Sequence, residues 1–287
     1  GNVNSLFEPH HEVASAIEVV RGPGSAKYGS NAVHGLVNVI LPDVGGGSEA
    51  VGSYGTLGRW RSDVTLDEGE HWLAAVSLQK DAGWRDNTGV DQQKLTLVGD
   101  WMLGAWNTTT WLTASNLNQE TAGFAQGPDA YKDEDIAKSN PNPEAYRDAW
   151  SARAGARLSR DFSGGTLTLT PYAHTQSMIF AQHFLPNGGV EKNGSDVDVA
   201  SGWLKEIQPD PFGFFPGDSR FPQGKHYDYT VDTLMGAVWG ELDFALSEQV
   251  RLLAGLRAEG HEYDYSTDVA PGINGRFNVP ADRTDSF

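Results

Sequence analysis

Apolar and polar residues alternate with a period of two through segment after segment of this sequence. In the stretch 72–79, Trp72, Ala74, Val76 and Leu78 alternate with Leu73, Ala75, Ser77 and Gln79. The stretches 59–66, 94–101, 107–116, 152–158, 166–174, 233–244 and 251–259 repeat this pattern with varying strength. Because successive side chains of a β-strand point to opposite faces, a period of two predicts strands. The sequence therefore predicts an all-β fold with about nine strands.

The two faces of these predicted strands differ in an informative way. The apolar faces are modest, whereas the opposite faces carry charges, such as Arg59, Arg61 and Asp63 in one strand and Arg257 and Glu259 in another. A soluble β-sandwich instead buries interlocking apolar residues on its inner faces. Apolar outer faces with polar inner faces are typical of a transmembrane antiparallel β-barrel, which needs only about ten residues per strand.

The links between the predicted strands alternate between short and long. The short links are 67–70, 102–105, 161–165 and 246–249, and the long ones are 81–90, 118–144 and 181–225. The first hairpin, through 55–58, is the exception, because its link is short although it belongs to the end of the sheet where the other predicted links are long. Outer-membrane barrels combine tight periplasmic turns with long external loops. Tryptophans near strand ends or on lipid faces fit an aromatic girdle: Trp101, Trp106, Trp111, Trp150 and Trp239.

Composition argues against several other classes of protein. The chain has 287 residues and a net charge of −17, which disfavours nucleic acid as a partner. It contains no cysteine, so neither disulfides nor a thiolate metal site can stabilise it. No stretch approaches the ~20 apolar residues of a transmembrane helix. There is no initiator methionine or signal peptide, so we expect a fragment of a longer protein.

The stretch 17–40 carries a second, independent pattern. It reads IEVVRGPGSAKYGSNAVHGLVNVI: a β-rich run, a Gly-Pro turn, a glycine-rich return and a second β-rich run that ends at Pro42. It resembles the end of the plug domain of TonB-dependent outer-membrane receptors. The matching positions are Ile17, Glu18, Arg21, Gly22, Pro23, Ser25, Tyr28, Gly29, Ala32, Gly35, Asn38 and Ile40. His34 stands where the family commonly has glycine.

This resemblance implies a plug inside a barrel of about 22 strands in the outer membrane of a Gram-negative bacterium. Residues 1–43 would be the C-terminal part of the plug, 44–48 a flexible glycine-rich linker and 49–287 the N-terminal part of the barrel. Related receptors carry an extra strand pair near 204–208, and whether such a pair is missing around 197–203 stays open.

The resemblance also implies a function, which is TonB-dependent active import, most commonly of a ferric-siderophore chelate. The implied partners are the ligand, outer-membrane lipid, and TonB, which would bind a segment upstream of residue 1. No cofactor and no enzymatic activity are expected. Cobalamin, haem or a glycan as the cargo remain alternatives, as do a passive porin and a soluble all-β binding module.

Aromatic and basic residues gather around the longest predicted loop and are the candidates for binding the ligand. They are Phe180, His183, Phe184, Phe215, Arg220, His226 and Tyr227. Aromatic rings and cations suit a flat, anionic chelate through stacking and cation attraction. The alternative for each residue, that it packs the loop against itself or anchors it at the membrane surface, stays open.

A plug arginine inside a polar lumen needs an acidic partner, because an unpaired buried charge is costly. Strand parity places Glu241 and Glu259 on lumen-facing positions, so they are candidates to pair with Arg21 and lock the plug in the barrel. The adjacent His10 and His11 form a weak metal candidate, because neighbouring side chains diverge. The sequence contains no convincing phosphate loop or nucleophile elbow.

Overall fold

The computed structural model describes residues 7–24, 28, 32–123, 125, 127–143, 145–162, 165–185, 189–195, 199–204, 224–245, 247, 249–267 and 283–286. Between residues 179 and 246 it describes the backbone of the strands without their side chains. The positions discussed below belong to these ranges unless stated otherwise.

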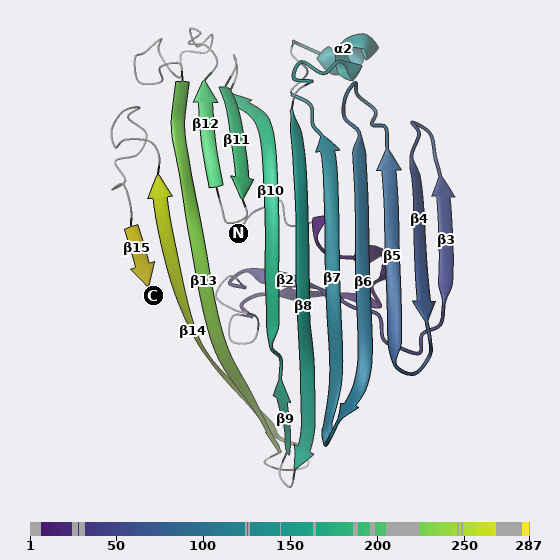
Figure 1. Ribbon diagram of the computed structural model, residues 1–287, viewed down its shortest axis with the longest axis vertical. Helices are drawn as coiled ribbons and strands as arrows, with labels where there is room; N and C mark the ends of the chain where they lie inside the picture. The colour runs from purple at the N-terminus through teal and green to yellow at the C-terminus, as the bar shows by residue number, and fades with distance from the viewer. Residues whose placement is uncertain are drawn as a thin grey trace.

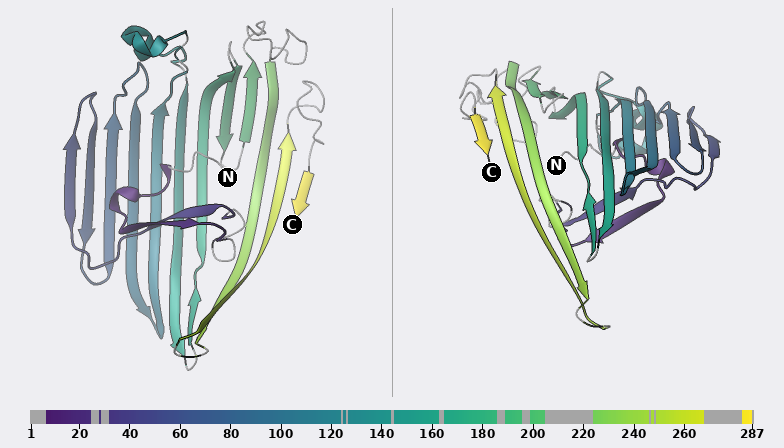
Figure 2. Two further views of the ribbon diagram at one scale, coloured as in Figure 1. Left: turned by 180° about the vertical axis from the view of Figure 1, so that it is seen from behind. Right: turned by 60° about the horizontal axis from the view of Figure 1, so that its bottom comes forward.

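Most of the described residues belong to one antiparallel sheet of thirteen strands (Figure 1). The strands are β3 (Glu49–Tyr54), β4 (Trp60–Asp67), β5 (Trp72–Asp81), β6 (Val90–Leu103), β7 (Trp106–Glu120), β8 (Tyr146–Phe162), β9 (Gly165–Leu169), β10 (Tyr172–Leu185), β11 (Gly189–Ser195), β12 (Val199–Leu204), β13 (Gly224–Ala245), β14 (Arg251–Thr267) and β15 (Arg283–Ser286). Neighbours in the sheet follow chain order, apart from β9, which pairs only with β8. The sheet is therefore an up-and-down meander, and it curves along its width (Figure 2).

The nine predicted strands are all present, with β9 and β10 forming one of them on either side of Pro171. The count of nine is nevertheless too low, because β11, β12 and β15 are additional strands within the described ranges. β11 and β12 have seven and six residues, fewer than the ~9–11 that a membrane crossing requires. The predicted alternation of links is confirmed from β4 to β8, with short turns at one end of the sheet and long connections at the other (Figure 1). The predicted long link 181–225 is wrong, because β10 continues to Leu185 and β11 and β12 lie within that range.

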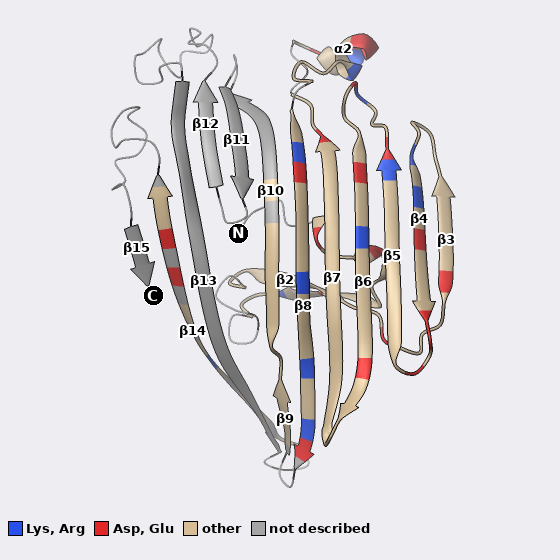
Figure 3. Cartoon of the chain, in the orientation of Figure 1, with Lys and Arg blue, Asp and Glu red and all other residues tan. Residues whose placement is uncertain are grey.

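The two faces of the sheet differ as their sequence parity predicts. In β4 to β6, six apolar side chains on one face are at least one-third exposed: Val64, Leu66, Val76, Leu78, Leu97 and Trp101. The opposite face holds the buried residues, of which Leu73, Ala75 and Val98 are apolar and Asp63, Ser77, Lys94 and Thr96 are polar. Charged residues also lie well inside the lengths of β4, β6 and β8 (Figure 3). The polar face is thus the covered one, which is the reverse of a water-soluble sheet.

The polar face is covered by the N-terminal residues, which include a hairpin of β1 (Ala16–Arg21) and β2 (Gly35–Ile40) lying across the inner side of the sheet (Figure 2). Asn38 Nδ2 donates to Glu18 Oε2 at 3.2 Å across the two strands. Gly35 has a φ of +132°, and a Cβ there would lie 2.4 Å from the Val20 carbonyl oxygen. These contacts explain why three positions of the plug-like pattern need a glutamate, an asparagine and a glycine.

Helical structure within the described ranges is slight. The helices with described bounds are η2 (His11–Val13), η3 (Ala130–Lys132) and α2 (Glu134–Lys138), the last two in the connection between β7 and β8, and the single described positions Phe7 and Tyr28 are also helical. In that part of the chain, no helix has the length and apolarity needed to span a membrane.

The glycine-rich linker 44–48 is held in place by hydrogen bonds. The Asp67 carboxylate accepts N–H groups from Gly45 at 2.9 Å and Gly47 at 2.6 Å, and Ser48 Oγ accepts the Asp67 N–H at 2.9 Å. Gly45 and Gly47 both have a φ of +93°. Glycine is needed here to reach this backbone geometry, whereas the sequence alone was interpreted as flexibility.

Candidate functional site

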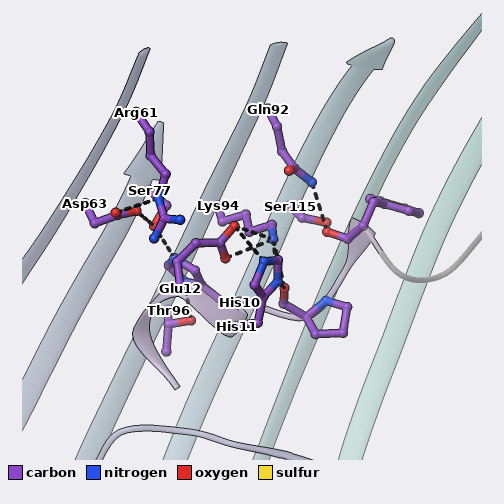
Figure 4. Close-up of polar contacts among 12 residues, drawn as sticks. His10, His11, Glu12, Arg61, Asp63, Ser77, Gln92, Lys94, Thr96 and Ser115 are labelled. Atoms are coloured by element: carbon purple, nitrogen blue, oxygen red, sulfur yellow. Dashed lines mark hydrogen bonds and ion pairs between the residues drawn. The ribbon is translucent and has the colours of Figure 1, made fainter. Parts of the chain in front are cut away.

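Residues Phe7–Val13, here called the anchor segment, cross the inner face of the sheet from β8 to β5 (Figure 4). At one end, Phe7 packs in a buried cluster with Leu117 of β7 and Ala149 of β8. Gln92 of β6 donates its amide to the Phe7 carbonyl at 3.1 Å. The segment is therefore attached to the wall through both side chains and backbone.

Charge pairs continue this attachment along the anchor segment. Glu8 Oε2 lies 3.2 Å from His174 Nε2 and 3.5 Å from Arg153 Nη2, on β10 and β8. Lys94 of β6 donates to both carboxylate oxygens of Glu12 at 3.0 Å and to the Pro9 carbonyl at 2.9 Å. The side chains of Lys94 and Glu12 are 2% and 4% exposed. Breaking such a pair is costly, because the remaining charge stays buried and unpaired.

His10 is the most buried polar residue of the anchor segment, at 2% exposure. Its Nδ1 lies 2.8 Å from Thr96 Oγ1, and its Nε2 lies 2.7 Å from Ser77 Oγ. Ser77 in turn donates to Asp63 Oδ1 at 2.5 Å. Burial lowers the pKa of His10 from 6.5 to about 4, against the opposing attraction of Glu12.

Asp63 also pairs with a cation on its own strand, since Arg61 Nε donates to Asp63 Oδ2 at 2.6 Å (Figure 4). His11, next to His10 in the sequence, has a side chain that is 54% exposed and has other partners, since its Nδ1 lies 3.3 Å from Lys94 Nζ and its Nε2 lies 3.4 Å from Glu12 Oε1. The predicted divergence of the two histidine side chains is thus confirmed. Both ring nitrogens of the buried His10 are hydrogen-bonded to hydroxyl groups. The described residues contain no group of three or more potential ligands placed to hold a metal ion.

The two ends of the β1–β2 hairpin return to one apolar cluster on the wall. Val13 precedes the hairpin, Leu41 and Val44 follow it, and all three pack against the buried cluster of β5 and β6. That cluster consists of Leu73, Ala75 and Val98. The Ser15 hydroxyl donates to the Leu41 carbonyl at 2.9 Å and so joins the two ends. The β1–β2 hairpin is therefore attached to the sheet at this cluster.

Five of the seven predicted ligand residues lie in strands near one end of the sheet, and their side chains are outside the described residues. Phe180, His183 and Phe184 belong to strand β10, and His226 and Tyr227 to strand β13. The placement of His183 and Phe184 in a loop from 181 to 225 is wrong, because β10 continues to Leu185 and pairs with β11. Phe215 and Arg220 lie outside the described residues. Their contact with a ligand stays a prediction.

The predicted lock between plug and barrel also stays a prediction. Arg21 is the exposed last residue of β1. Glu241 of β13 pairs by register with Gly255, and Glu259 of β14 pairs with Ala237, but the side chains of both glutamates lie outside the described residues. Of the other pattern residues, Gly22 has a φ of +92° in the turn after β1. Pro23 follows it, Tyr28 is described with a backbone bond to Gly24, and Gly29 is outside the described residues.

Glu12, Lys94 and Ser77 were not among the functional residues predicted from the sequence. One signal was present, because Lys94 stands on the polar face of its strand, where a buried cation needs an acid. The sequence could not say which acid, since Glu12 lies 82 residues earlier in the chain.

The long connection between β5 and β6 and that between β7 and β8 lie at the end of the sheet where β10 ends (Figure 1), and they are joined to each other. Arg85 donates to the Gly123 carbonyl at 2.7 Å and to the Ser139 carbonyl at 3.1 Å. The acidic run 133–135 has a structural explanation, because Asp133 Oδ1 accepts the N–H groups of Asp135 and Ile136 at the start of α2. Exposed aromatic side chains in these connections, Trp84 and Tyr131, were not among the predicted ligand residues.

A curved meander with exposed apolar faces, and with an N-terminal hairpin laid across its polar face, is the architecture of a plugged barrel wall. No protein-family model and no curated protein matches the sequence. Solved structures do match. The ferric-catecholate import receptor Fiu from E. coli K12 in its open form has a TM-score of 0.59 at 16% identity, over 98% of this chain and 56% of that one.

Two further solved structures are similar to this chain in fold. The ferric yersiniabactin uptake receptor FyuA from Yersinia pestis has a TM-score of 0.59 at 13% identity, over 94% of this chain and 48% of that one. The pyoverdine outer membrane receptor FpvA from Pseudomonas aeruginosa PAO1 has a TM-score of 0.52 at 12% identity, over 90% of this chain and 36% of that one. The chain thus has the fold of TonB-dependent siderophore receptors and spans about half the length of the first structures it matches.

Proposed function

We propose that this chain is the plug end and the first part of the barrel of an outer-membrane receptor that actively imports a scarce ligand. The observation that carries the proposal is the sidedness of the sheet. Apolar side chains such as Val76 and Leu97 are exposed on the outer face, whereas polar ones such as Lys94 and Thr96 are covered by the anchor segment. Lipid is the environment in which such an outer face is stable.

The seated plug argues for active import rather than passive diffusion. Buried contacts tie the anchor segment to four successive strands, β5 to β8, so the plug does not leave the lumen without an input of free energy. In the proposed mechanism, ligand binding favours a plug state that TonB can engage, and energy from the inner membrane then displaces the plug. The chain performs no covalent chemistry in this scheme, and its further partners are TonB and outer-membrane lipid.

A ferric-siderophore chelate is the cargo that we propose. The three similar structures are named as receptors for ferric catecholate, ferric yersiniabactin and pyoverdine. The aromatic and basic candidates near the ends of β10 and β13, among them His183, Arg220 and Tyr227, would bind the chelate by stacking and charge attraction. Cobalamin, haem or a glycan are the alternative cargoes.

The division of the chain belongs to the same proposal. Residues 1–43 form the plug part, 44–48 the linker and 49–287 the barrel part, with the bonds to Asp67 fixing the joint. The pairing of Arg21 with Glu241 or Glu259 would add a second lock at the far end of the hairpin.

Growth on defined iron sources tests this function. A deletion strain should lose growth on one or more ferric siderophores and regain it with the full-length gene, provided that TonB is present. Exchange of Arg220 for Gln together with Tyr227 for Ala should reduce uptake of that cargo, whereas Lys132→Met, at an exposed ion pair, should not. Uptake that is independent of TonB, or recovery of the protein in the soluble fraction without detergent, would refute the proposal.

A further inference from the structure

A directed line of hydrogen bonds connects the plug to the wall through His10. The Asp63 carboxylate only accepts hydrogen bonds, so the Ser77 hydroxyl uses its single hydrogen for the 2.5 Å bond to Asp63. Ser77 Oγ must then accept from His10, and Nε2 carries the ring hydrogen in the 2.7 Å contact. In a neutral imidazole the other nitrogen is an acceptor, so Nδ1 receives the Thr96 hydroxyl hydrogen at 2.8 Å.

We infer that His10 is a positioning residue that seats the anchor segment on the barrel wall in its neutral form, so that the plug is held at neutral pH and loosened in acid. The inference rests on the proposed function, in which residues 7–43 belong to a plug that must stay seated until it is displaced. The fold alone does not require His10 to be uncharged where it contacts Ser77 and Thr96, whereas a plug seated in this way does.

Protonation of His10 conflicts with the geometry of the site. A hydrogen on Nδ1 would point at the Thr96 hydroxyl oxygen. The Thr96 hydroxyl could then no longer donate to Nδ1, and its hydrogen would have to turn toward another acceptor. Thr96 is fully buried, so that rearrangement has little room. Losing a partner in a buried site costs more than the bond itself contributes.

The charged groups around His10 do not compensate for a cation. The plug contributes Glu12 and His11, β4 contributes Asp63 and Arg61, and β6 contributes Lys94. Among these described side chains, Glu12 is paired with Lys94 at 3.0 Å and Asp63 with Arg61 at 2.6 Å. Each of these two acids is therefore already paired with a base. Burial is the largest influence on the pKa of the His10 ring, and it favours the neutral form.

The direction of the pH effect follows from linkage. Burial holds the pKa of seated His10 near 4, whereas a released anchor segment has a histidine of ordinary pKa 6.5. Above about pH 6.5 both states are neutral at this position. Between 6.5 and 4 only the released state takes up a proton, so release becomes more favourable as the pH falls, and the effect levels off near pH 4. Relative to pH 7.5, the release constant should rise about tenfold at pH 5.5 and roughly 70-fold at pH 4.5.

The test measures plug release in the full-length receptor without ligand or TonB. A nitroxide at Val33→Cys, an exposed position of the plug, reports release in urea through its mobility, which does not itself depend on pH. Release midpoints at pH 7.5, 5.5 and 4.5 give the release constants. His10→Gln removes the titrating group, and its release constant should be nearly independent of pH. His34→Gln is the matched control, because this plug histidine is exposed, lies outside the anchor segment and should leave the pH response as in the wild type.

Two results would overturn the inference: a wild-type release constant that is the same at pH 7.5 and 4.5, or a His10→Gln variant with the full acid response. If His10→Gln does not assemble, the wild-type profile decides. Relative to pH 7.5, it must rise by no more than about tenfold per pH unit, as one proton requires, and reach roughly 70-fold at pH 4.5. Because this measurement uses no cargo, its failure is distinct from failure of the growth test for the proposed function.

Discussion

Replacing Lys94 by methionine should unseat the anchor segment, because the half-exposed His11 ring, 3.4 Å from Glu12 Oε1, would be the only cation candidate left beside the buried Glu12 carboxylate among the described side chains. Both side chains are nearly inaccessible, at 2% and 4% exposure, and the lysine makes two 3.0 Å contacts with the carboxylate. Removing one partner of such a pair costs about 3 kcal/mol or more. At fixed pH, hydrogen exchange of the peptide that covers residues 7–15 should become at least about 100-fold faster, since about 1.4 kcal/mol corresponds to a factor of ten.

A double-mutant cycle separates this reason from a general loss of packing. Lys94→Met combined with Glu12→Gln removes both charges and should cost only about 1 kcal/mol, chiefly through the lost bond to the Pro9 carbonyl. Lys132→Met is the matched control, because its ion pair with Asp129 is 61% and 65% exposed and should contribute almost nothing. The reasoning is refuted if Lys94→Met changes exchange by less than tenfold, or if the double variant is as impaired as the sum of the singles.

Three further variants test other parts of the structure. Asp67→Ala removes the acceptor for the linker amides, so protease cleavage within 44–48 should accelerate about tenfold or more; unchanged cleavage would contradict this. Gly35→Ala places a Cβ 2.4 Å from a carbonyl oxygen and should abolish plug seating in the spin-label assay, whereas Gly52→Ala, with open space around it, should behave like wild type. Leu97→Arg on the exposed apolar face should destabilise the barrel in lipid by about 2–4 kcal/mol in urea unfolding; a neutral effect would contradict a lipid-facing position.

Strand positions were predictable because alternation is a local property. The side chains of Val76 and Ser77 must point to opposite faces whatever the rest of the chain does, and the structure confirms which of them is exposed. The plug pattern was equally readable, because a positive φ at Gly35 and the Glu18–Asn38 bond arise within a single hairpin.

The ends of strands were less predictable, because they depend on pairing. His183 and Phe184 were assigned to a loop, yet β10 continues to Leu185 because β11 pairs with it. The linker was interpreted as flexible from its glycines, yet the Asp67 carboxylate, about twenty residues further on, fixes it. In both cases the deciding partner is a backbone or side chain that a local window does not contain.

The pattern of residues along the chain was enough to predict β-strands, the apolar face of each strand, and two β-rich runs on either side of a glycine-rich connection within 17–40. The contact of Glu12 with Lys94, and the position of His10 between Ser77 and Thr96, could be found only in the folded structure. The physical reason is that alternation and backbone geometry act between neighbours. The seat of the plug depends instead on the register at which a crossing segment lies over four strands, and contacts between residues 67 to 86 positions apart set that register.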